Sequence, residues 1–223
     1  MSKSSDLLYR AGILDKTGGQ QRGKYMLIRV HMIRHGITEG NQQKKLYGTT
    51  DLPLTEAGVK ALKNRAAAKI YPKKDGAAFF TSGMLRTEQT LNIIYGDIIH
   101  APVDDLKEMS FGEFENYTFE DLKNHPDYIE WYGDKSGDRP APGGESFNEF
   151  TERVMSGFKI VTSAAENSSS HTSIVICHAG PIVMIMNSIF PGAVQNPFNW
   201  LPAPGHGYTV IFSGDKVSGY TRF

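Results

Sequence analysis

Residues 26–36 read Met-Leu-Ile-Arg-Val-His-Met-Ile-Arg-His-Gly, an apolar run that ends in an arginine, a histidine and a glycine. We expect a buried strand over 26–33, because parallel strands that are covered on both faces are apolar along their whole length. A second such run, 172–177, carries no charge and leads into His178-Ala-Gly. Ligands of open α/β sheets bind beyond the carboxyl ends of the strands. The sequence therefore predicts that His35 and His178 face each other over one small volume.

Strand-like and helix-like segments alternate along the chain, which predicts an α/β fold. We expect a three-layer sandwich, with a largely parallel central sheet flanked by helices and a small helical cap. Thr55 is expected to cap the first long helix. Further strands are predicted at 77–81, 98–103, 208–212 and 216–223, the last two as a closing pair, and helices at 84–95, 145–166 and 181–190.

Residues 105–142 differ from the rest, because they are rich in aromatic and acidic side chains and are broken by proline and glycine. We interpret this stretch as a cap inserted over the site; the alternative is an irregular segment with an aromatic core of its own. Residues 26–223 are then one domain that contains the cap. Residues 1–25 are set apart as a native N-terminal extension or as part of an expression tag, which residues 17–21 resemble.

The composition narrows the class of function. Lys and Arg together number 24, as do Asp and Glu, so the formal net charge is zero and the basic surplus of a nucleic-acid-binding protein is missing. No apolar run approaches the roughly 20 residues that span a bilayer, and residues 1–10 lack the pattern of a signal peptide. The single cysteine, Cys177, fits a reducing compartment. We therefore expect a cytoplasmic protein with no nucleic-acid or membrane partner.

A third segment carries a candidate anion-binding group. Residues 82–90 also follow a predicted strand and open a helix, which places Arg86 on the first turn, near the positive end of the helix dipole. Guanidinium groups bind phosphate through paired, charge-assisted hydrogen bonds. Arg34, Arg86 and the helix N-terminus together predict a site for a dianion.

The order of these segments resembles that of the histidine phosphatase superfamily, which includes the cofactor-dependent phosphoglycerate mutases and the alpha-ribazole phosphatases. The resemblance covers the chain from about residue 26 to about residue 189, and it leans towards the alpha-ribazole and broad-specificity phosphatase branch. The matching segments are Arg34–Asn41, Tyr47–Thr55, Ser82–Arg86, Leu106–Glu108 with Phe111 and Gly112, Pro142–Ser146 and His178–Gly180.

The resemblance implies a role for each matching residue. His35 would be the nucleophile and Glu108 the general acid. No metal ion and no cofactor are expected, because the two arginines and the second histidine supply the positive charge. The phosphoryl oxygens would be held by Arg34, Asn41, Arg86 and His178. Further contacts to the substrate are expected from Tyr47, Gly48 and Ala179.

Phosphoryl transfer to a histidine places physical demands on these groups. His35 should be a neutral imidazole that is oriented by a hydrogen bond from its other ring nitrogen. His178, beside the phosphate, is expected to act as an imidazolium. Glu108 should be protonated when it donates to the leaving oxygen and should then accept a proton from water. The alternatives for this acid lie close in sequence: Asp105, Glu113 and Glu115.

These observations predict a metal-independent phosphomonoester hydrolase that acts on a small-molecule phosphate ester through a phosphohistidine. The alternatives are a phosphoglycerate mutase-type transfer and a non-catalytic binder of phosphorylated ligands, and a homodimer is compatible with each. Two departures from the family pattern affect the substrate pocket: Tyr47 stands where glutamine is common, and Phe114-Glu-Asn where Trp-Glu-Gly is common. A ring-bearing leaving group, as in alpha-ribazole phosphate, is favoured by the cap residues Tyr117, Phe119, Tyr128 and Trp131.

Other residues that match a motif are assigned no catalytic role. His31 and His35 have the i, i+4 spacing of a helical zinc pair, but they lie on a predicted strand with no third ligand in view. Cys177 ends an apolar strand and is expected to be a small buried side chain. Residues 18–24 fit the spacing of a P-loop, but they precede a strand, whereas a P-loop follows one.

Overall fold

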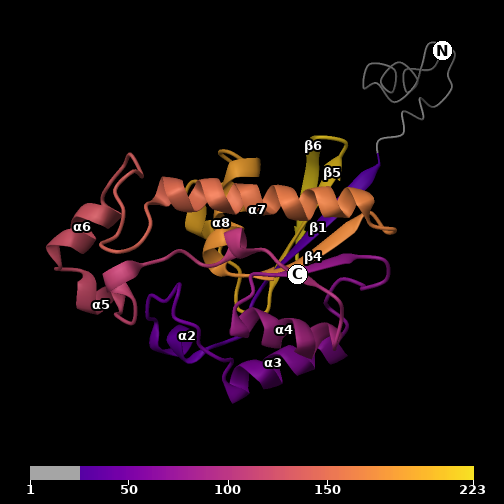
Figure 1. Cartoon of the computed structure of the whole chain (residues 1–223), viewed down its shortest axis with the longest axis horizontal. Helices are drawn as coiled ribbons and strands as arrows, with labels where there is room; N and C mark the ends of the chain where they lie inside the picture. Colours follow the sequence, from indigo (N-terminus) through magenta and orange to yellow (C-terminus); the bar gives the residue numbers. More distant parts are fainter. Residues whose placement is uncertain (1–25) are drawn as a thin grey trace, which may run out of the picture.

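The computed structural model describes residues 26–223, and the predictions for residues 1–25 lie outside this part of the chain. Its strands are β1 (Leu27–Arg34), β2 (Ala78–Thr81), β3 (Ala101–Pro102), β4 (Thr172–Cys177), β5 (Gly207–Ser213) and β6 (Lys216–Arg222). They form one sheet in the order β3-β2-β4-β1-β5-β6 (Figure 1). The strands β3, β2, β4 and β1 run parallel to one another. β5 is antiparallel to β1, and β6 at the edge is antiparallel to β5.

Helices cover both faces of the sheet. They are α2 (Glu39–Gln43), α3 (Glu56–Ala67), α4 (Leu85–Tyr95), α5 (Phe119–Leu122), α6 (Pro126–Tyr132), α7 (Phe147–Asn167) and α8 (Ala179–Ile189), with 3-10 turns η1 (Asp104–Leu106), η2 (Gly112–Phe114) and η3 (Pro197–Trp200). α7 and α8 pack together and against β1 on one face, whereas α3 packs on α4 on the other (Figure 1). The predicted α/β sandwich with a largely parallel sheet and a small helical cap is confirmed.

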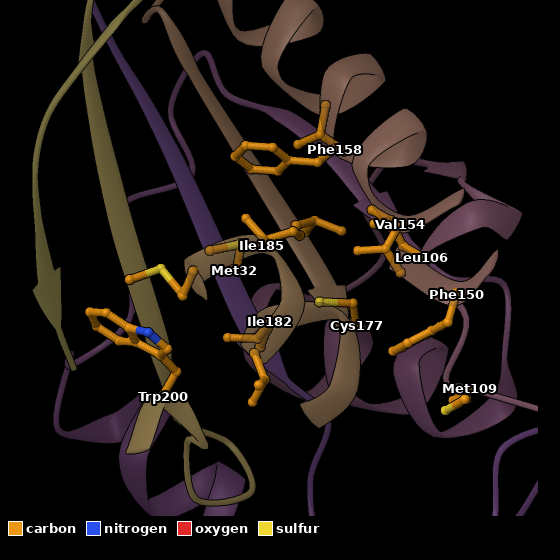
Figure 2. Close-up of a cluster of buried hydrophobic side chains, with 14 of the residues drawn as sticks. Met32, Leu106, Met109, Phe150, Val154, Phe158, Cys177, Ile182, Ile185 and Trp200 are labelled. Atoms are coloured by element: carbon orange, nitrogen blue, oxygen red, sulfur yellow. The ribbon is translucent and has the colours of Figure 1, made fainter. Parts of the chain in front are cut away.

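The central strand β4 is buried on both faces of the sheet. All six of its side chains are buried. Val175 and Cys177 point into a cluster that α7 and α8 close, and Figure 2 shows Cys177 in this cluster beside residues of those helices. Ile174 and Ile176 point the other way, into a cluster that α4 closes through Leu91. An uncharged strand is the only kind that fits between two apolar layers.

The strand order brings three chain segments to one edge of the sheet. Arg34, the last residue of β1, is paired with Cys177, the last residue of β4. On the other side of β4, Thr81 at the end of β2 is paired with Ile176. The residues that follow these strands therefore start from neighbouring points, as the sequence predicts for a site at the carboxyl ends.

Three local predictions differ from the structure. β3 has only two residues, because it lies at the edge of the sheet and pairs only with Phe80 and Thr81 at the end of the short strand β2. α8 begins at Ala179 rather than Pro181, which leaves the proline in the first turn. The short helix α2 was not expected. Thr38 caps it in a reciprocal capping box: the Thr38 hydroxyl accepts the Asn41 N–H, and Asn41 Oδ1 accepts the Thr38 N–H.

The aromatic side chains of the cap pack on one another and also onto the main core. Phe114, Tyr128 and Trp131 belong to the same buried cluster as Met32 of β1. Trp131 also stacks on Phe147 at the start of α7, with 5.1 Å between ring centroids. The cap is therefore continuous with the layer formed by α7. Within residues 26–223, none of the helices has the length and apolar character needed to cross a bilayer.

Candidate active site

His35 lies directly after β1 and is 2% exposed. Its Nδ1 lies 2.7 Å from the carbonyl oxygen of Gly36, which can only accept, so Nδ1 carries the proton and Nε2 keeps its lone pair. Burial lowers the pKa of His35 well below its ordinary value, and the charges of Arg86 and Arg34 lower it further. The ring is therefore a neutral imidazole with one fixed nucleophilic nitrogen, the state that a phosphoryl acceptor requires.

His178 faces His35 from the end of β4. The two ring centroids are 5.2 Å apart, and the rings meet edge-on. Arg86 Nε donates to His178 Nδ1 over 3.2 Å, and His178 Nε2 lies 2.7 Å from Ser82 Oγ. A nitrogen that accepts from a guanidinium bears no proton. The imidazolium that we expected at His178 is therefore not the state in this structure: burial and then Arg86 hold its pKa well below the ordinary value.

Arg86 lies on the first turn of α4 and is fully buried. Its Nη2 donates to Gly48 O and its Nη1 to Thr50 O, both over 3.0 Å, and Nη1 also lies 3.4 Å from Asp51 Oδ1. The Asp51 carboxylate in turn accepts the Leu85 N–H at the helix N-terminus, over 2.9 Å. The predicted anion-binding role of this N-terminus thus needs correction, because a side chain of the protein already uses that N–H.

A cavity of about 130 Å³ lies beside His35. Arg34 enters it from β1, with Nη1 donating to Pro202 O over 2.8 Å. Its Nε is buried and has no hydrogen-bond partner within residues 26–223. Leaving such a donor without a partner costs free energy. The lining residues are Arg34, His35, Asn41, Lys45, Leu46, Tyr47, Glu108 and Phe111.

Two of the predicted binding residues reach the cavity from the segment after β1. Asn41 Oδ1 accepts from the backbone and hydroxyl of Thr38, so Nδ2 is the group that Asn41 can offer to an anion. Tyr47 is buried, bonds the Thr38 hydroxyl over 2.7 Å, and has its ring 5.1 Å from the Arg86 guanidinium carbon. Tyr47 thus packs against the arginine, and it meets His35 edge-on.

Glu108 lies on the far side of the same cavity. Its Oε2 accepts the Gly180 N–H over 3.1 Å, and its Oε1 accepts the Met109 N–H over 3.0 Å. A Cβ at Gly180 would come within 2.1 Å of Oε1. At Gly180 the group that needs the space is the carboxylate of Glu108, and at Gly36 it is the side chain of Leu62.

The alternatives to Glu108 are placed elsewhere. Glu115 does not line the cavity, and its carboxylate binds the backbone and hydroxyls of Thr49 and Thr50. Burial alone would raise the pKa of Glu115, but these hydrogen bonds outweigh it and hold the pKa below its usual value. Glu113 is exposed. Of the four neighbouring acids, only Glu108 lines the cavity that holds His35.

Sequence reasoning missed several supporting residues. Arg153 of α7 donates to the carbonyl oxygens of Lys107 and Glu108 and forms a two-point ion pair with Glu145, which fixes the backbone that carries the acid. Lys45 is a further cation on the cavity wall. Arg153 has no pattern in the sequence that marks it, whereas Lys45 lies two residues before the matching segment at Tyr47 and could have been found there.

The residues that we set aside as structural occupy structural positions. His31 bonds Thr209 Oγ1 over 2.7 Å, and burial lowers its pKa to about 4. Cys177 is fully buried, which raises the pKa of its thiol. Within residues 26–223, no three His, Cys, Asp or Glu side chains are grouped closely enough to hold a metal ion.

A family model described as the histidine phosphatase superfamily (branch 1) matches residues 30–218. The chain belongs to this superfamily. Among histidine phosphatases and their relatives, it is 29% identical to the uncharacterized phosphatase PhoE of Bacillus subtilis (strain 168), over 73% of this chain and 78% of that protein. It is 31% identical to a 2,3-bisphosphoglycerate-dependent phosphoglycerate mutase of Methylocella silvestris, over 56% of this chain and 63% of that one.

Solved structures share the fold at lower identity. A candidate alpha-ribazole-5'-P phosphatase from Escherichia coli superposes with a TM-score of 0.74 at 20% identity, covering 88% of this chain and 94% of that one. A phosphoglycerate mutase from Thermus thermophilus gives a TM-score of 0.64 at 23% identity, covering 88% of this chain and 98% of that one. Phosphatases and mutases therefore both occur among the proteins that this histidine phosphatase resembles.

The buried histidines predict how stability depends on pH. His31, His35 and His178 have lowered pKa values in the folded protein, so below about pH 6.5 the unfolded chain binds more protons than the folded one. The contribution of these neutral histidines to the free energy of unfolding is complete above that pH and is lost as the pH falls. Each group adds up to about 1.4 kcal/mol per pH unit. Urea unfolding between about pH 7 and about pH 5 should show the decline, and His31→Gln should reduce its slope by one proton; an unchanged slope would contradict this assignment.

Proposed function

We propose that this histidine phosphatase hydrolyses phosphomonoesters through a covalent phosphohistidine at His35. The observation that carries the proposal is the fixed tautomer of His35, whose Nδ1 is held by Gly36 while Nε2 keeps its lone pair, in a cavity that Arg34 and Glu108 also line. A neutral imidazole is both a nucleophile and an acceptable leaving group, so it can divide hydrolysis into two displacements.

In the first displacement, His35 Nε2 forms a bond to phosphorus and the bond to the ester oxygen breaks. Protonated Glu108 gives its proton to that oxygen, and the alcohol leaves. In the second, water attacks phosphorus, Glu108 takes back a proton, and the N–P bond breaks to release inorganic phosphate. The buried charges of Arg34 and Arg86 stabilise the phosphoryl oxygens in both steps, so we propose that no metal ion is required.

A second cavity, of about 210 Å³, adjoins the first and supports a proposal about the leaving group. Glu108, Leu46 and Phe111 line both cavities, so the acid lies where the ester oxygen would pass from one to the other. Ala179 lines the second cavity as well. The walls are otherwise apolar or aromatic: Met109, Tyr128, Trp131, Tyr132, Phe147, Phe150, Val183, Met184, Phe198 and Leu201.

We propose a ring-bearing, uncharged alcohol as the leaving group, of which alpha-ribazole is one example. Two of the four cap aromatics that suggested this, Tyr128 and Trp131, line the apolar cavity. The other two, Tyr117 and Phe119, are exposed and do not. Among the residues that the structure describes, no Lys or Arg lines this cavity to pair with a substrate carboxylate, which favours such esters over phosphoglycerates.

A panel of esters tests the proposal. In EDTA, kcat/KM for 1-naphthyl phosphate should exceed that for 3-phosphoglycerate by about tenfold or more, because ring burial contributes about 1.5–3 kcal/mol. Phe198→Ala, on a residue that lines the second cavity, should reduce this preference, whereas Phe119→Ala, on a cap residue that does not line it, should not. Faster turnover of 3-phosphoglycerate, or interconversion of phosphoglycerate isomers, would support the mutase-type alternative instead.

A further inference from the structure

Glu115 is linked to Arg86 through the loop that contains Gly48, Thr49 and Thr50. Its Oε1 accepts the Thr49 N–H and the Thr49 hydroxyl, each over 2.7 Å. Its Oε2 accepts the Thr50 N–H over 2.8 Å and the Thr50 hydroxyl as well. All four of these hydrogen bonds are thus made to two successive residues of one loop.

The backbone of the same loop also binds Arg86, through the carbonyl oxygens of Gly48 and Thr50. The peptide group between Gly48 and Thr49 gives its N–H to Glu115 and its carbonyl oxygen to Arg86 Nη2. Thr50 also gives its N–H to Glu115 and its carbonyl oxygen to Arg86 Nη1, but these two groups belong to successive peptide groups, so planarity links the two ends in the Gly48–Thr49 peptide alone. A peptide group is planar, with its N–H and C=O on opposite sides, so fixing one end fixes the direction of the other. An anion at the N–H and a cation at the C=O also polarise both hydrogen bonds in the same sense.

Glu115 is itself anchored. It directly follows η2, and the next residue, Asn116, has φ 68°, in the left-handed region that asparagine tolerates better than most residues. The Asn116 N–H donates to Leu46 O over 2.8 Å, and Leu46 N–H donates to Tyr117 O over 2.8 Å. The turn that carries Glu115 is therefore fastened to the start of the same loop.

We propose that Glu115 is a positioning residue that sets the direction of the Arg86 guanidinium and, through the bond from Arg86 Nε, the ring of His178. The inference rests on the proposed function in one respect, that Arg86 and His178 hold a phosphoryl group. Because Thr49 is exposed, water can satisfy the freed N–H groups when Glu115 is changed. The loss of Glu115 should therefore reduce catalysis far more than it reduces stability.

A double-mutant cycle between Glu115 and Arg86 tests the proposal. Glu115→Gln should lower kcat/KM for p-nitrophenyl phosphate by about tenfold or more, since residues that share one network couple strongly. In an Arg86→Ala background the same change should have an effect of about twofold or less. Equal losses in both backgrounds would overturn the proposal, because a residue that only stabilises the fold acts regardless of Arg86.

Two further variants keep the test decisive if Glu115→Gln unfolds. Thr50→Val removes only the hydroxyl bond, and it should give a smaller loss that also disappears in the Arg86→Ala background. Glu113→Gln, on an exposed residue of the same turn, is the matched control and should leave kcat/KM unchanged. A loss from Glu113→Gln equal to that from Glu115→Gln would contradict the assignment.

The same double-mutant cycle can be measured through phosphate binding, without turnover. Inorganic phosphate should raise the Tm of the wild-type protein, and Glu115→Gln should shrink that rise unless Arg86 is already absent. If the wild type binds phosphate but releases no product, the proposed function fails while the positioning role is still measured. If turnover depends on His35 but the cycle is additive, the positioning role fails and the proposed function stands.

Discussion

Replacing His35 with alanine should lower kcat for p-nitrophenyl phosphate by at least about 10⁴-fold, because removal of a nucleophile leaves only binding and charge stabilisation. It should also abolish labelling. A brief incubation of the wild type with a radiolabelled ester, followed by denaturation, should leave phosphate attached through a bond that acid breaks and alkali spares. The His35→Ala protein should carry none.

His31→Gln is the control for this experiment, because His31 is also a buried histidine of β1 but its partner is Thr209. It should retain labelling and most of the activity. If His35→Ala kept a tenth of the wild-type kcat, the covalent mechanism would be excluded. If wild type and His35→Ala both gave no product but bound phosphate, the chain would be a non-catalytic binder.

Glu108→Gln should have an effect that depends on the leaving group. General acid catalysis contributes about 10²–10⁴-fold when the departing oxygen needs a proton. The loss in kcat should approach that range for an alkyl phosphate, whose alkoxide is a poor leaving group. It should be much smaller for p-nitrophenyl phosphate, whose phenolate leaves without help. Steady-state kinetics with both esters give the ratio.

The isosteric amide keeps the shape of the side chain and one of its two backbone hydrogen bonds, because its NH2 group cannot accept the Met109 N–H. The carbonyl oxygen of glutamine can still accept the Gly180 N–H that Glu108 Oε2 accepts now. Glu115→Gln provides a contrast, since the loss of a positioning residue should reduce both esters by a similar factor. An equal loss for both esters in Glu108→Gln would mean that Glu108 is not the proton donor.

Much of the fold follows from patterns that extend over one element. The apolar runs of β1 and β4 predict buried parallel strands, and the alternation of elements predicts the layers. The strand β3 could not be predicted at its true length, because that length is set by pairing with the last two residues of β2, which the apolar run 98–103 does not show. The helix α2 was not predicted because its capping box uses Asn41 where glutamate or glutamine is usual.

The site shows the same difference between what a local pattern predicts and what depends on distant segments. Residues within the matching motifs, such as His35, Arg86 and Glu108, could be named from the sequence, and the structure brings them together. What could not be foreseen are contacts that depend on distant segments. The tautomer of His178 follows from the Arg86 side chain of another element, and the backbone of Glu108 is held by Arg153 of α7. Glu115 was in view only as an alternative acid, because a motif shows that a residue is present but not what it contacts.

The position of β1 between β4 and β5 has a consequence for biosynthesis. β1, which leads into His35, is synthesised long before β4 and β5, the two strands that pair with it. Pairing across so long a loop is slow and exposes an apolar strand in the meantime. Enzymatic activity should therefore appear only after β5 has been released, which would make it a sensitive reporter of complete folding, and truncation before Gly207 should yield an inactive, aggregation-prone chain.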